Sequence, residues 1–395
     1  MEIPQAVERI IQTLEENGFE AFAVGGCVRD TLLGRTPEDW DITTSAQPEE
    51  VKKLFRRTID TGIQHGTVTV LENRIGYEVT TYRIDGIYED GRHPKSVEFT
   101  SDLLEDLKRR DFTINAMAYS HKTGIIDAFG GMEDLKNGMI RCVGCARDRF
   151  TEDALRILRA IRFSAQLGFS VEEKTLEAVA EIAPNLIHVS KERIQVELTK
   201  LLCSSHPERM AMVFEQGLAP FLSSHFSGIE KPDRESTNRL SDQFSGEKYV
   251  RWAAFLRCLI PADAARILKE LKMDNDTISR VKILTEWWKV AIEAEKYSIR
   301  KVMSQMPAEL FDALLDFRRA AGTESREQWE QLKFLTEEIR QSGDCISLKM
   351  LAVTGADLIA AGVKPGRELG EMLNHMLEDV LQYPEHNTKE YLLRF

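Results

Sequence analysis

The sequence has few cysteines and no long apolar segment. Six cysteines among 395 residues are too few for a disulfide scaffold. No uninterrupted apolar run approaches the roughly 18 residues that a membrane-spanning helix needs. The N-terminal stretch MEIPQAVERI is acidic and amphipathic, and it has no basic and then apolar signal region. These absences predict a cytoplasmic protein with no membrane segment.

Positive charge is also scarce. The formal net charge is −12, which argues against a uniformly basic surface for nucleic acid. Basic residues are nevertheless concentrated at Lys108–Arg110 and between Arg141 and Arg162. Hydrophobic residues make up 43% and charged residues 29%, which is enough for a packed core. We expect a folded protein that contacts any polyanion through local patches.

Four residues raise the alternative of a zinc site. Cys142 and Cys145 form C-x-x-C, and Cys203 and His206 form C-x-x-H. Such pairs can ligate zinc together. Because the two pairs lie far apart in the chain, we favour unlinked, reduced cysteines.

The chain changes character along its length. Up to about residue 140, helical periodicity alternates with strand patterns, as in PQAVERIIQTLEENG and TVTVLENRIGYEVTTYR. Beyond about residue 145 the segments are helical, and we expect the polar stretch 226–248 to be a surface loop. The pattern predicts an α+β protein with a small α/β head and a helical remainder. We expect a head at 1–140, a neck at 141–204, a body at 205–275 and a tail at 276–395.

A glycine turn forms the first candidate site. Gly25 and Gly26 follow a strand pattern and open a short helix, where backbone amides can approach phosphate oxygens. Arg29 lies one turn into that helix and can reach the same phosphates. Most glycine pairs are only turns, so this feature alone is a weak indication.

Three acids strengthen that indication. Asp39 and Asp41 are two residues apart in DWDITTS, so in a strand both carboxylates share one face while Trp40 and Ile42 point to the core. Paired carboxylates of this kind suit Mg²⁺. Glu78 lies in another strand pattern and becomes a third carboxylate of the site if the two strands pair. The competing interpretation is a set of solvated acids on an edge strand.

Four motifs in order resemble the class II nucleotidyltransferases. They are GGCVRD (25–30), DWD (39–41), RRDFTINAMA (109–118) and EDALRILRAIRF (152–163). Within that family the chain is similar to the bacterial CCA-adding enzymes, and the segment 351–380 resembles their C-terminal part. The resemblance implies a nucleotidyltransferase head with a mixed sheet, followed by an elongated, all-helical neck, body and tail.

The resemblance also implies a reaction. The family adds C, C and A to the 3′ end of tRNA from CTP and ATP, without a nucleic-acid template. Asp39 and Asp41 would hold two Mg²⁺ ions, one activating the tRNA 3′-hydroxyl and the other steadying the leaving pyrophosphate. The tail would bind tRNA. A homodimer is left open.

Further residues are assigned to the nucleotide by the resemblance. Gly26 and Arg29 would hold the triphosphate, Arg110 would add positive charge there, and Asp111 would accept from the ribose. The alternative for KRRD is a basic helix end that interacts with its own dipole.

The segment TEDALRILRAIRF (151–163) is predicted to be one helix with a row of charges. Asp153 can accept from the exocyclic amine of cytosine or adenine, and Arg156 can donate to the adjacent ring nitrogen. Guanine and uracil present the opposite pattern, so the pair would select C and A. Arg159 and Arg162 continue the row toward the nucleotide. The competing interpretation is a surface ion pair on a solvated helix.

Three rival functions remain. A bacterial poly(A) polymerase shares the head, but its relatives usually carry a longer basic C-terminal extension. An enzyme that adds only A stays open, whereas CC-only relatives lack part of the loop that here runs from Arg83 to Pro94. A non-catalytic RNA-binding protein on the same fold is disfavoured by the intact pair Asp39 and Asp41.

Overall fold

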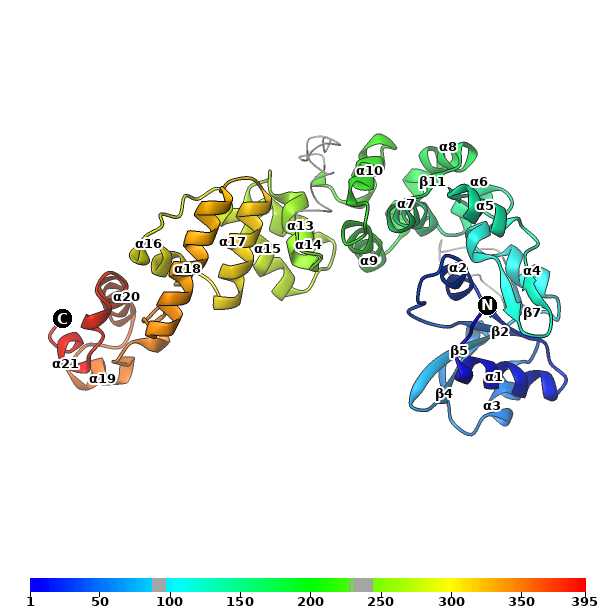
Figure 1. Ribbon diagram of the computed structural model, residues 1–395, viewed down its shortest axis with the longest axis horizontal. Coiled ribbons are helices and arrows are strands. Elements are labelled where there is room, and N and C mark those ends of the chain that lie inside the picture. Colours follow the sequence, from blue (N-terminus) through cyan, green and yellow to red (C-terminus); the bar gives the residue numbers. More distant parts are fainter. Residues whose placement is uncertain (87–96, 227–228, 230–243) are drawn as a thin grey trace. The chain divides into compact units, whose positions relative to one another are not determined.

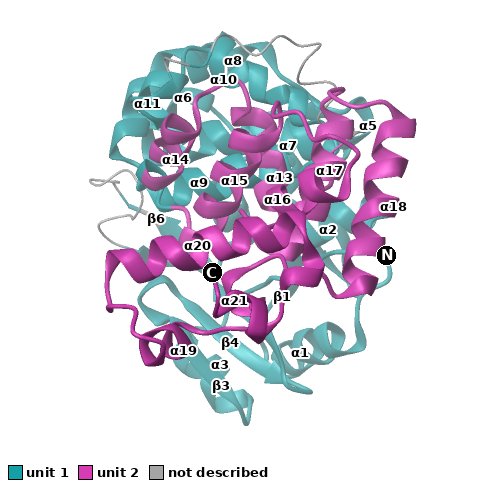
Figure 2. Cartoon of the chain, turned by 90° about the vertical axis from the view of Figure 1, so that its left-hand side faces the viewer, with its two compact units in different colours: residues 1–238, 270–272 teal, residues 239–269, 273–395 magenta. Residues whose placement is uncertain are grey.

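The computed structural model describes residues 1–86, 97–226, 229 and 244–395 (Figure 1). These residues form two compact units, which Figure 2 distinguishes by colour. The first unit comprises residues 1–238 and 270–272, and the second comprises residues 239–269 and 273–395. No helix in the described part of the chain is both long and apolar enough to cross a membrane.

The first unit begins with a mixed sheet, as predicted. Seven strands lie in the order β3-β4-β5-β2-β1-β8-β9, in which β2 and β5 are parallel and the other neighbours are antiparallel. The strands are β1 (Ala21–Val24), β2 (Ile42–Thr44), β3 (Thr58–Gly62), β4 (Thr67–Glu72), β5 (Ile75–Thr81), β8 (Ala118–Ser120) and β9 (Gly124–Ile126). A separate pair joins β6 (Arg83–Asp85) to β7 (Val97–Phe99).

Helices cover both faces of the sheet. The head contains α1 (Gln5–Glu16), α2 (Gly26–Leu32), α3 (Pro48–Leu54), α4 (Leu103–Lys108) and α5 (Gly131–Asn137). Because side chains alternate along β1, Ala21 and Ala23 pack with α1 and α3, whereas Phe22 and Val24 pack with α4. Strand β1 is therefore buried on both sides.

The head helices follow from local sequence. Val7, Ile10, Ile11 and Leu14 form one apolar stripe that buries α1, as the periodicity predicts. The N-cap of α4 is Asp102, whose carboxylate accepts from the Leu104 amide at 2.8 Å.

The rest of the first unit is mainly helical. It contains α6 (Ala146–Glu152), α7 (Leu155–Leu167), α8 (Glu173–Ile182), α9 (Lys191–Leu202), α10 (Ala211–Glu215) and α11 (Ala219–Leu222). One short parallel pair, β10 (Met139–Ile140) with β11 (Ser170–Val171), interrupts the expected all-helical neck.

The second unit is helical in its described residues. Its helices are α13 (Lys248–Leu256), α14 (Pro261–Glu270), α15 (Asn275–Trp287), α16 (Lys296–Met303), α17 (Ala308–Ala320), α18 (Arg326–Ser342), α19 (Gly355–Ala360), α20 (Arg367–Gln382) and α21 (Lys389–Leu392). Most of the polar stretch 226–248, and of the loop from Arg83 to Pro94, lies outside the described residues.

The segment 151–163 is not the single helix that the periodicity predicts. Helix α6 ends at Glu152 and α7 begins at Leu155, and between them Asp153 has an extended backbone (φ −145°, ψ 100°). The Asp153 carboxylate accepts from the Leu155 amide at 3.1 Å, so its short side chain competes with the helical hydrogen bonds. Asp153 and Arg156 therefore do not lie three apart on one helix.

Candidate nucleotide site

A pocket of about 630 Å³ lies in the first unit. It is lined by the turn before α2, by the acids before β2, by residues of RRDFTINAMA and by α7 and α9. Eight predicted site residues line it: Gly26, Arg29, Asp39, Asp41, Arg110, Asp111, Arg159 and Arg162. Three predicted residues, Glu78, Asp153 and Arg156, are not part of its lining.

The glycine turn brings the backbone close to Arg110. Gly25 has φ 82°, a value that side-chain-bearing residues rarely adopt, and its amide donates to the Met117 carbonyl at 3.1 Å. A Cβ atom at Gly25 would lie 3.0 Å from Arg110 Nη1. The turn therefore requires glycine at position 25, while the phosphate contact of Gly26, which also lines the pocket, stays a prediction.

The two acids before β2 lie where their carboxylates repel each other. Strand β2 begins only at Ile42, so Asp39 and Asp41 precede the strand in which they were predicted to lie; Ile42 is fully buried, Trp40 packs on the core and Asp39 is exposed. Burial, then the charge of Asp39, raises the pKa of Asp41 to about 6, although Arg110 opposes this. A bound cation would relieve that repulsion, so the pair fits a divalent metal ion.

Glu78 lies near this pair but outside the pocket. The parallel register aligns Ile42 of β2 with Val79 of β5, which places Glu78 beside Asp41. The charge of Glu78 contributes to the raised pKa of Asp41. Among the described residues, no cluster of three or more histidine, cysteine, aspartate or glutamate side chains could hold a metal. A metal on Asp39 and Asp41 would therefore need oxygen ligands from substrate or water.

A chain of hydrogen bonds joins the glycine turn to α7. Arg29 is buried, and its Nη1 donates to Asn115 Oδ1 at 2.6 Å. The Asn115 amide donates in turn to Asp111 Oδ1 at 3.1 Å, and Arg159 donates to Asp111 Oδ2 at 2.7 Å. Burial opposes ionisation of Asp111, but Arg159, Asn115 and Arg156 together outweigh it and hold the pKa of Asp111 well below the usual range. This chain fixes two arginines of the pocket relative to each other.

Arginine side chains surround one aromatic ring in the pocket. The guanidinium groups of Arg29, Arg159 and Arg162 lie 4.9, 5.3 and 3.7 Å from the centre of the Phe163 ring. Such cation–π contacts partly compensate the repulsion between the three cations. Arg162 also donates to Glu197 of α9 at 2.6 Å. Six basic and five acidic side chains line the pocket, so its arginines can attract a polyanion while its acids can bind a cation.

Arg110 retains unused hydrogen-bonding capacity. Its Nη2 lies 3.4 Å from Asp106 Oδ2, and Asp106 is engaged more closely by Arg109 at 2.7 Å. The buried Nε of Arg110 has no hydrogen-bond partner among the described residues. A buried donor without a partner is costly, which is consistent with a ligand oxygen at this position.

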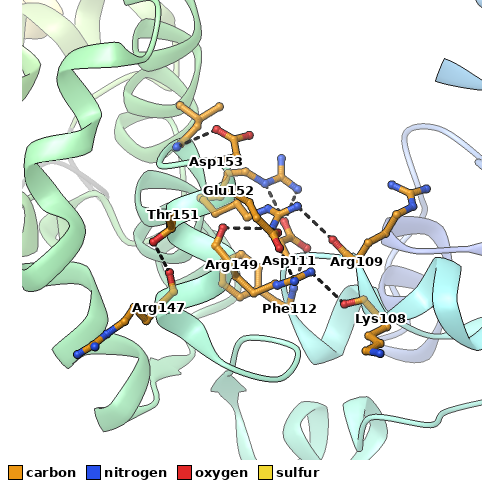
Figure 3. Close-up of polar contacts among 12 residues, drawn as sticks. Lys108, Arg109, Asp111, Phe112, Arg147, Arg149, Thr151, Glu152 and Asp153 are labelled. Carbon is orange, nitrogen blue, oxygen red and sulfur yellow. Dashed lines mark hydrogen bonds and ion pairs between the residues drawn. The ribbon is translucent and has the colours of Figure 1, made fainter. Parts of the chain in front are cut away.

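Asp153 and Arg156 lie just outside the pocket, each in an ion pair (Figure 3 shows Asp153 and its neighbours). Arg193 contacts both Asp153 oxygens, at 3.3 and 2.7 Å. Arg156 donates to Glu152 at 2.6 Å and to the Arg109 carbonyl at 3.1 Å. Each of the two side chains therefore has fixed partners. Burial lowers the pKa of nearby Arg159, but the surrounding acids raise it overall, Asp111 and Glu197 more than Asp153.

Other residues of the pocket were missed by the sequence analysis. Asn115 lies in the motif RRDFTINAMA and Phe163 in EDALRILRAIRF, so these motifs could have indicated both residues as part of the site. Arg35 and Lys200 line the pocket but lie outside every motif, and only the tertiary structure brings them there. None of the six cysteines, all of which are described residues, forms a disulfide, and the burial of Cys142 raises the pKa of its thiol.

Three models of protein families match parts of this chain. Residues 21–141 match a model described as "Poly A polymerase head domain", and residues 245–395 match one for tRNA nucleotidyltransferase domain 2. Residues 168–227 match "Probable RNA and SrmB- binding site of polymerase A".

Individual relatives extend over nearly the whole chain. The CCA-adding enzyme of Leuconostoc mesenteroides is 39% identical over 373 residues, covering 92% of this chain and 88% of the relative. That of Levilactobacillus brevis is 39% identical and covers 97% of this chain and 95% of the relative. A crystal structure of the Bacillus stearothermophilus CCA-adding enzyme in complex with CTP superposes with a TM-score of 0.84, at 32% identity, over 100% of this chain and 97% of that one. The chain therefore belongs to the family of CCA-adding enzymes, which are tRNA nucleotidyltransferases.

Proposed function

We propose that the pocket binds CTP or ATP and that the protein adds C, C and A to the 3′ end of tRNA, releasing pyrophosphate. The main support is the pocket itself, which gathers an acid pair and five arginines around one glycine turn. Relatives over nearly the full length bear the name CCA-adding enzyme, which disfavours poly(A) polymerase, A-only addition and a silent RNA-binding protein.

Asp39 and Asp41 would hold the metal. Nucleotidyltransferases of this family depend on metal ions, and we propose Mg²⁺ because hard carboxylate oxygens, with phosphates and water, form its usual ligand set. The metal would activate the 3′-hydroxyl and neutralise charge on the leaving group. The raised pKa of Asp41 supports this assignment, since it comes from burial and then from the charge of Asp39, which Arg110 offsets only in part. Glu78 adds to that charge without lining the pocket.

The triphosphate would lie against the glycine turn and its arginines. We propose that Gly26 gives the phosphates access to the backbone and that Arg29 and Arg110 bind their oxygens. Asp30 contacts Arg29 at 2.8 Å, so a phosphate would meet an arginine whose position is already fixed. Arg110 offers its unpartnered Nε.

Asp111 would act on the nucleotide through Arg159. Its Oδ1 accepts from the Phe112 amide and from Asn115, and its Oδ2 accepts twice from Arg159. A carboxylate has about four acceptor positions, so a ribose hydroxyl would have to displace an existing donor. We therefore propose that Asp111 orients Arg159 instead of accepting directly from the ribose as predicted.

Asp153 and Arg156 would select the base. An ionised carboxylate only accepts hydrogen bonds and a guanidinium only donates them, which matches cytosine and adenine and opposes uracil and guanine. Their positions, held by ion pairs beside Arg159, support this role although the pocket in its present shape does not include them. Arg159 and Arg162 would contribute charge to the same nucleotide.

The partners follow from the reaction. We propose that tRNA contacts the helical part of the chain, and the predicted tail above all, in the cytoplasm. The neck, body and tail at 141–204, 205–275 and 276–395 remain predictions, as does a homodimer.

The direct test uses radiolabelled CTP and ATP with a tRNA that ends before CCA. The proposed enzyme extends it by C, C and A and then stops. Long adenosine tails would identify a poly(A) polymerase, and incorporation of A only on tRNA already ending in CC would identify an A-adding enzyme. No incorporation in the presence of Mg²⁺ would leave an RNA-binding role.

A further inference from the structure

Phe163 lies among the arginines of the pocket. It lines the pocket but is only 4% exposed. The guanidinium groups of Arg29, Arg159 and Arg162 all lie within 5.3 Å of the centre of its ring. Because Arg29 belongs to α2 and the other two arginines belong to α7, one ring connects two separate elements of the site.

A second aromatic side chain holds the ring of Phe163 in place. Phe112 is fully buried, and its ring meets that of Phe163 at an interplanar angle of 83°, with the ring centres 5.8 Å apart. Edge-to-face pairs of this kind are a favoured arrangement and add to the stabilisation from burial. Phe112 directly follows Asp111 in the chain, so the contact also connects Phe163 to the motif RRDFTINAMA. The ring therefore has a fixed orientation relative to the arginines.

The cations around the ring need more than their carboxylate partners. Burial lowers the pKa of Arg162, and the charge of Glu197 opposes this only in part, while the charge of Arg159 lowers the pKa further. The Phe163 ring centre lies 3.7 Å from the Arg162 guanidinium group. Since the face of an aromatic ring attracts a cation, and does so most strongly where water is excluded, the ring supplies stabilisation that the ionised groups do not.

An alternative role for Phe163 is to stack on the base of the nucleotide. The Arg162 guanidinium group lies against one face of the ring at 3.7 Å, which is van der Waals contact distance. A base on that face would have to displace Arg162. The geometry therefore favours a ring that orients arginines over a ring that stacks on a base.

We propose that Phe163 is a positioning residue, whose ring holds Arg29, Arg159 and Arg162 through cation–π contacts in the arrangement that binds the incoming nucleotide. The inference rests on the proposed function, in which these arginines bind CTP or ATP. Because they contribute charge and do not read the base, the effect of the ring is the same for both nucleotides.

Loss of the aromatic ring has a definite consequence. Leucine in its place keeps much of the apolar volume but offers no negative face, so the three guanidinium groups move apart under their mutual repulsion. Nucleotide binding weakens, whereas the metal-holding acids Asp39 and Asp41 are unchanged, so KM rises while kcat is retained. The strength of a cation–π contact corresponds to a rise of about threefold to thirtyfold.

The experiment alters the electrons of the ring without altering its shape. Phe163 is replaced by phenylalanine that carries one, two or three fluorine atoms on the ring, and separately by leucine. Each fluorine withdraws electron density from the face of the ring and so weakens its attraction for cations. On tRNA lacking its CCA end, KM for CTP and for ATP should rise stepwise with the number of fluorine atoms, at nearly constant kcat and melting temperature.

A matched control lies in the preceding helix. Phe150 of α6 is fully buried, and in the described part of the chain it forms no cation–π contact. The same fluorinated series at Phe150 should leave KM for both nucleotides at the wild-type value. Thermal melting of every variant measures any general effect on packing.

The outcomes are distinguishable. A KM that stays constant across the fluorinated Phe163 series would overturn the inference and leave the proposed function intact, even if Phe163→Leu fails to fold. A rise in KM that also occurs in the Phe150 series, or that follows a loss of melting temperature, would show a packing effect and contradict the inference. A wild-type protein that adds neither CTP nor ATP to the tRNA would refute the proposed function and the inference with it.

Discussion

Replacing Asp41 by asparagine should make the metal-free protein more stable while abolishing nucleotide transfer. Burial and the neighbouring charge of Asp39 raise the pKa of Asp41 from 3.8 to about 6. The folded protein therefore binds this proton more tightly than the unfolded chain does. Ionised Asp41 opposes folding, and asparagine keeps a similar shape without the charge.

The magnitude follows from the difference in pKa. Roughly two pH units at about 1.4 kcal/mol each give on the order of 3 kcal/mol. The raised pKa stabilises the wild-type fold fully below about pH 4, and that contribution is lost as the pH rises to about 6. The stability gain of Asp41→Asn should thus be largest near pH 8 and fall to about half near pH 5.

Thermal melting with a chelator present provides the assay. Asp41→Asn should melt several degrees above wild type at pH 8 and less so at pH 5. Asp148→Asn, a change at an exposed acid of α6, is the matched control and should shift stability by about 0.5 kcal/mol or less. Mg²⁺ should raise the melting temperature of wild type but not of Asp41→Asn. A variant less stable than wild type at pH 8, or one that transfers nucleotides normally, would refute the reasoning.

Three further predictions concern other parts of the chain. Asn115→Ala removes a partner of both Arg29 and Asp111, so it should destabilise the protein by about 1–3 kcal/mol and raise KM for CTP and ATP alike; an altered base preference would contradict this. Deleting residues 86–92 should leave C addition largely intact and stop the final A, as measured by product length, whereas equal loss of both would assign the loop to folding. Affinity for tRNA, measured by filter binding, should fall steeply between low and high salt, and a flat profile would exclude phosphate contacts as its basis.

The helices and strands that were predicted correctly are those with a clear local pattern in the sequence. The apolar stripe of α1 and the two alternating strands of β4 and β5 were predicted because each pattern has a single compatible structure. The acid pair before β2 was predicted to point away from Trp40 and Ile42, and both of those residues do pack inward. The short strands β3, β8 and β9 were not predicted, since their three to five residues gain stability only from their neighbours in the sheet.

Long-range contacts explain what the sequence could not indicate. The helical periodicity of 151–163 concealed the break at Asp153, because the local hydrogen bond from the Leu155 amide to the Asp153 carboxylate leaves that periodicity unchanged and the Arg193 ion pair comes from tertiary structure. The link from Arg29 through Asn115 to Asp111 joins residues as many as 86 positions apart. Such partners are visible only once the chain is folded.

Equilibrium binding of the four nucleoside triphosphates without tRNA tests the central claim most directly. If the side chains of the protein select the base, CTP and ATP should bind with Mg²⁺ present, and UTP and GTP should bind at least about tenfold more weakly. All four should lose affinity in Arg110→Ala, because the triphosphate contact is common to them. Equal binding of all four nucleotides to the protein alone, with discrimination appearing only when tRNA is added, would contradict the account.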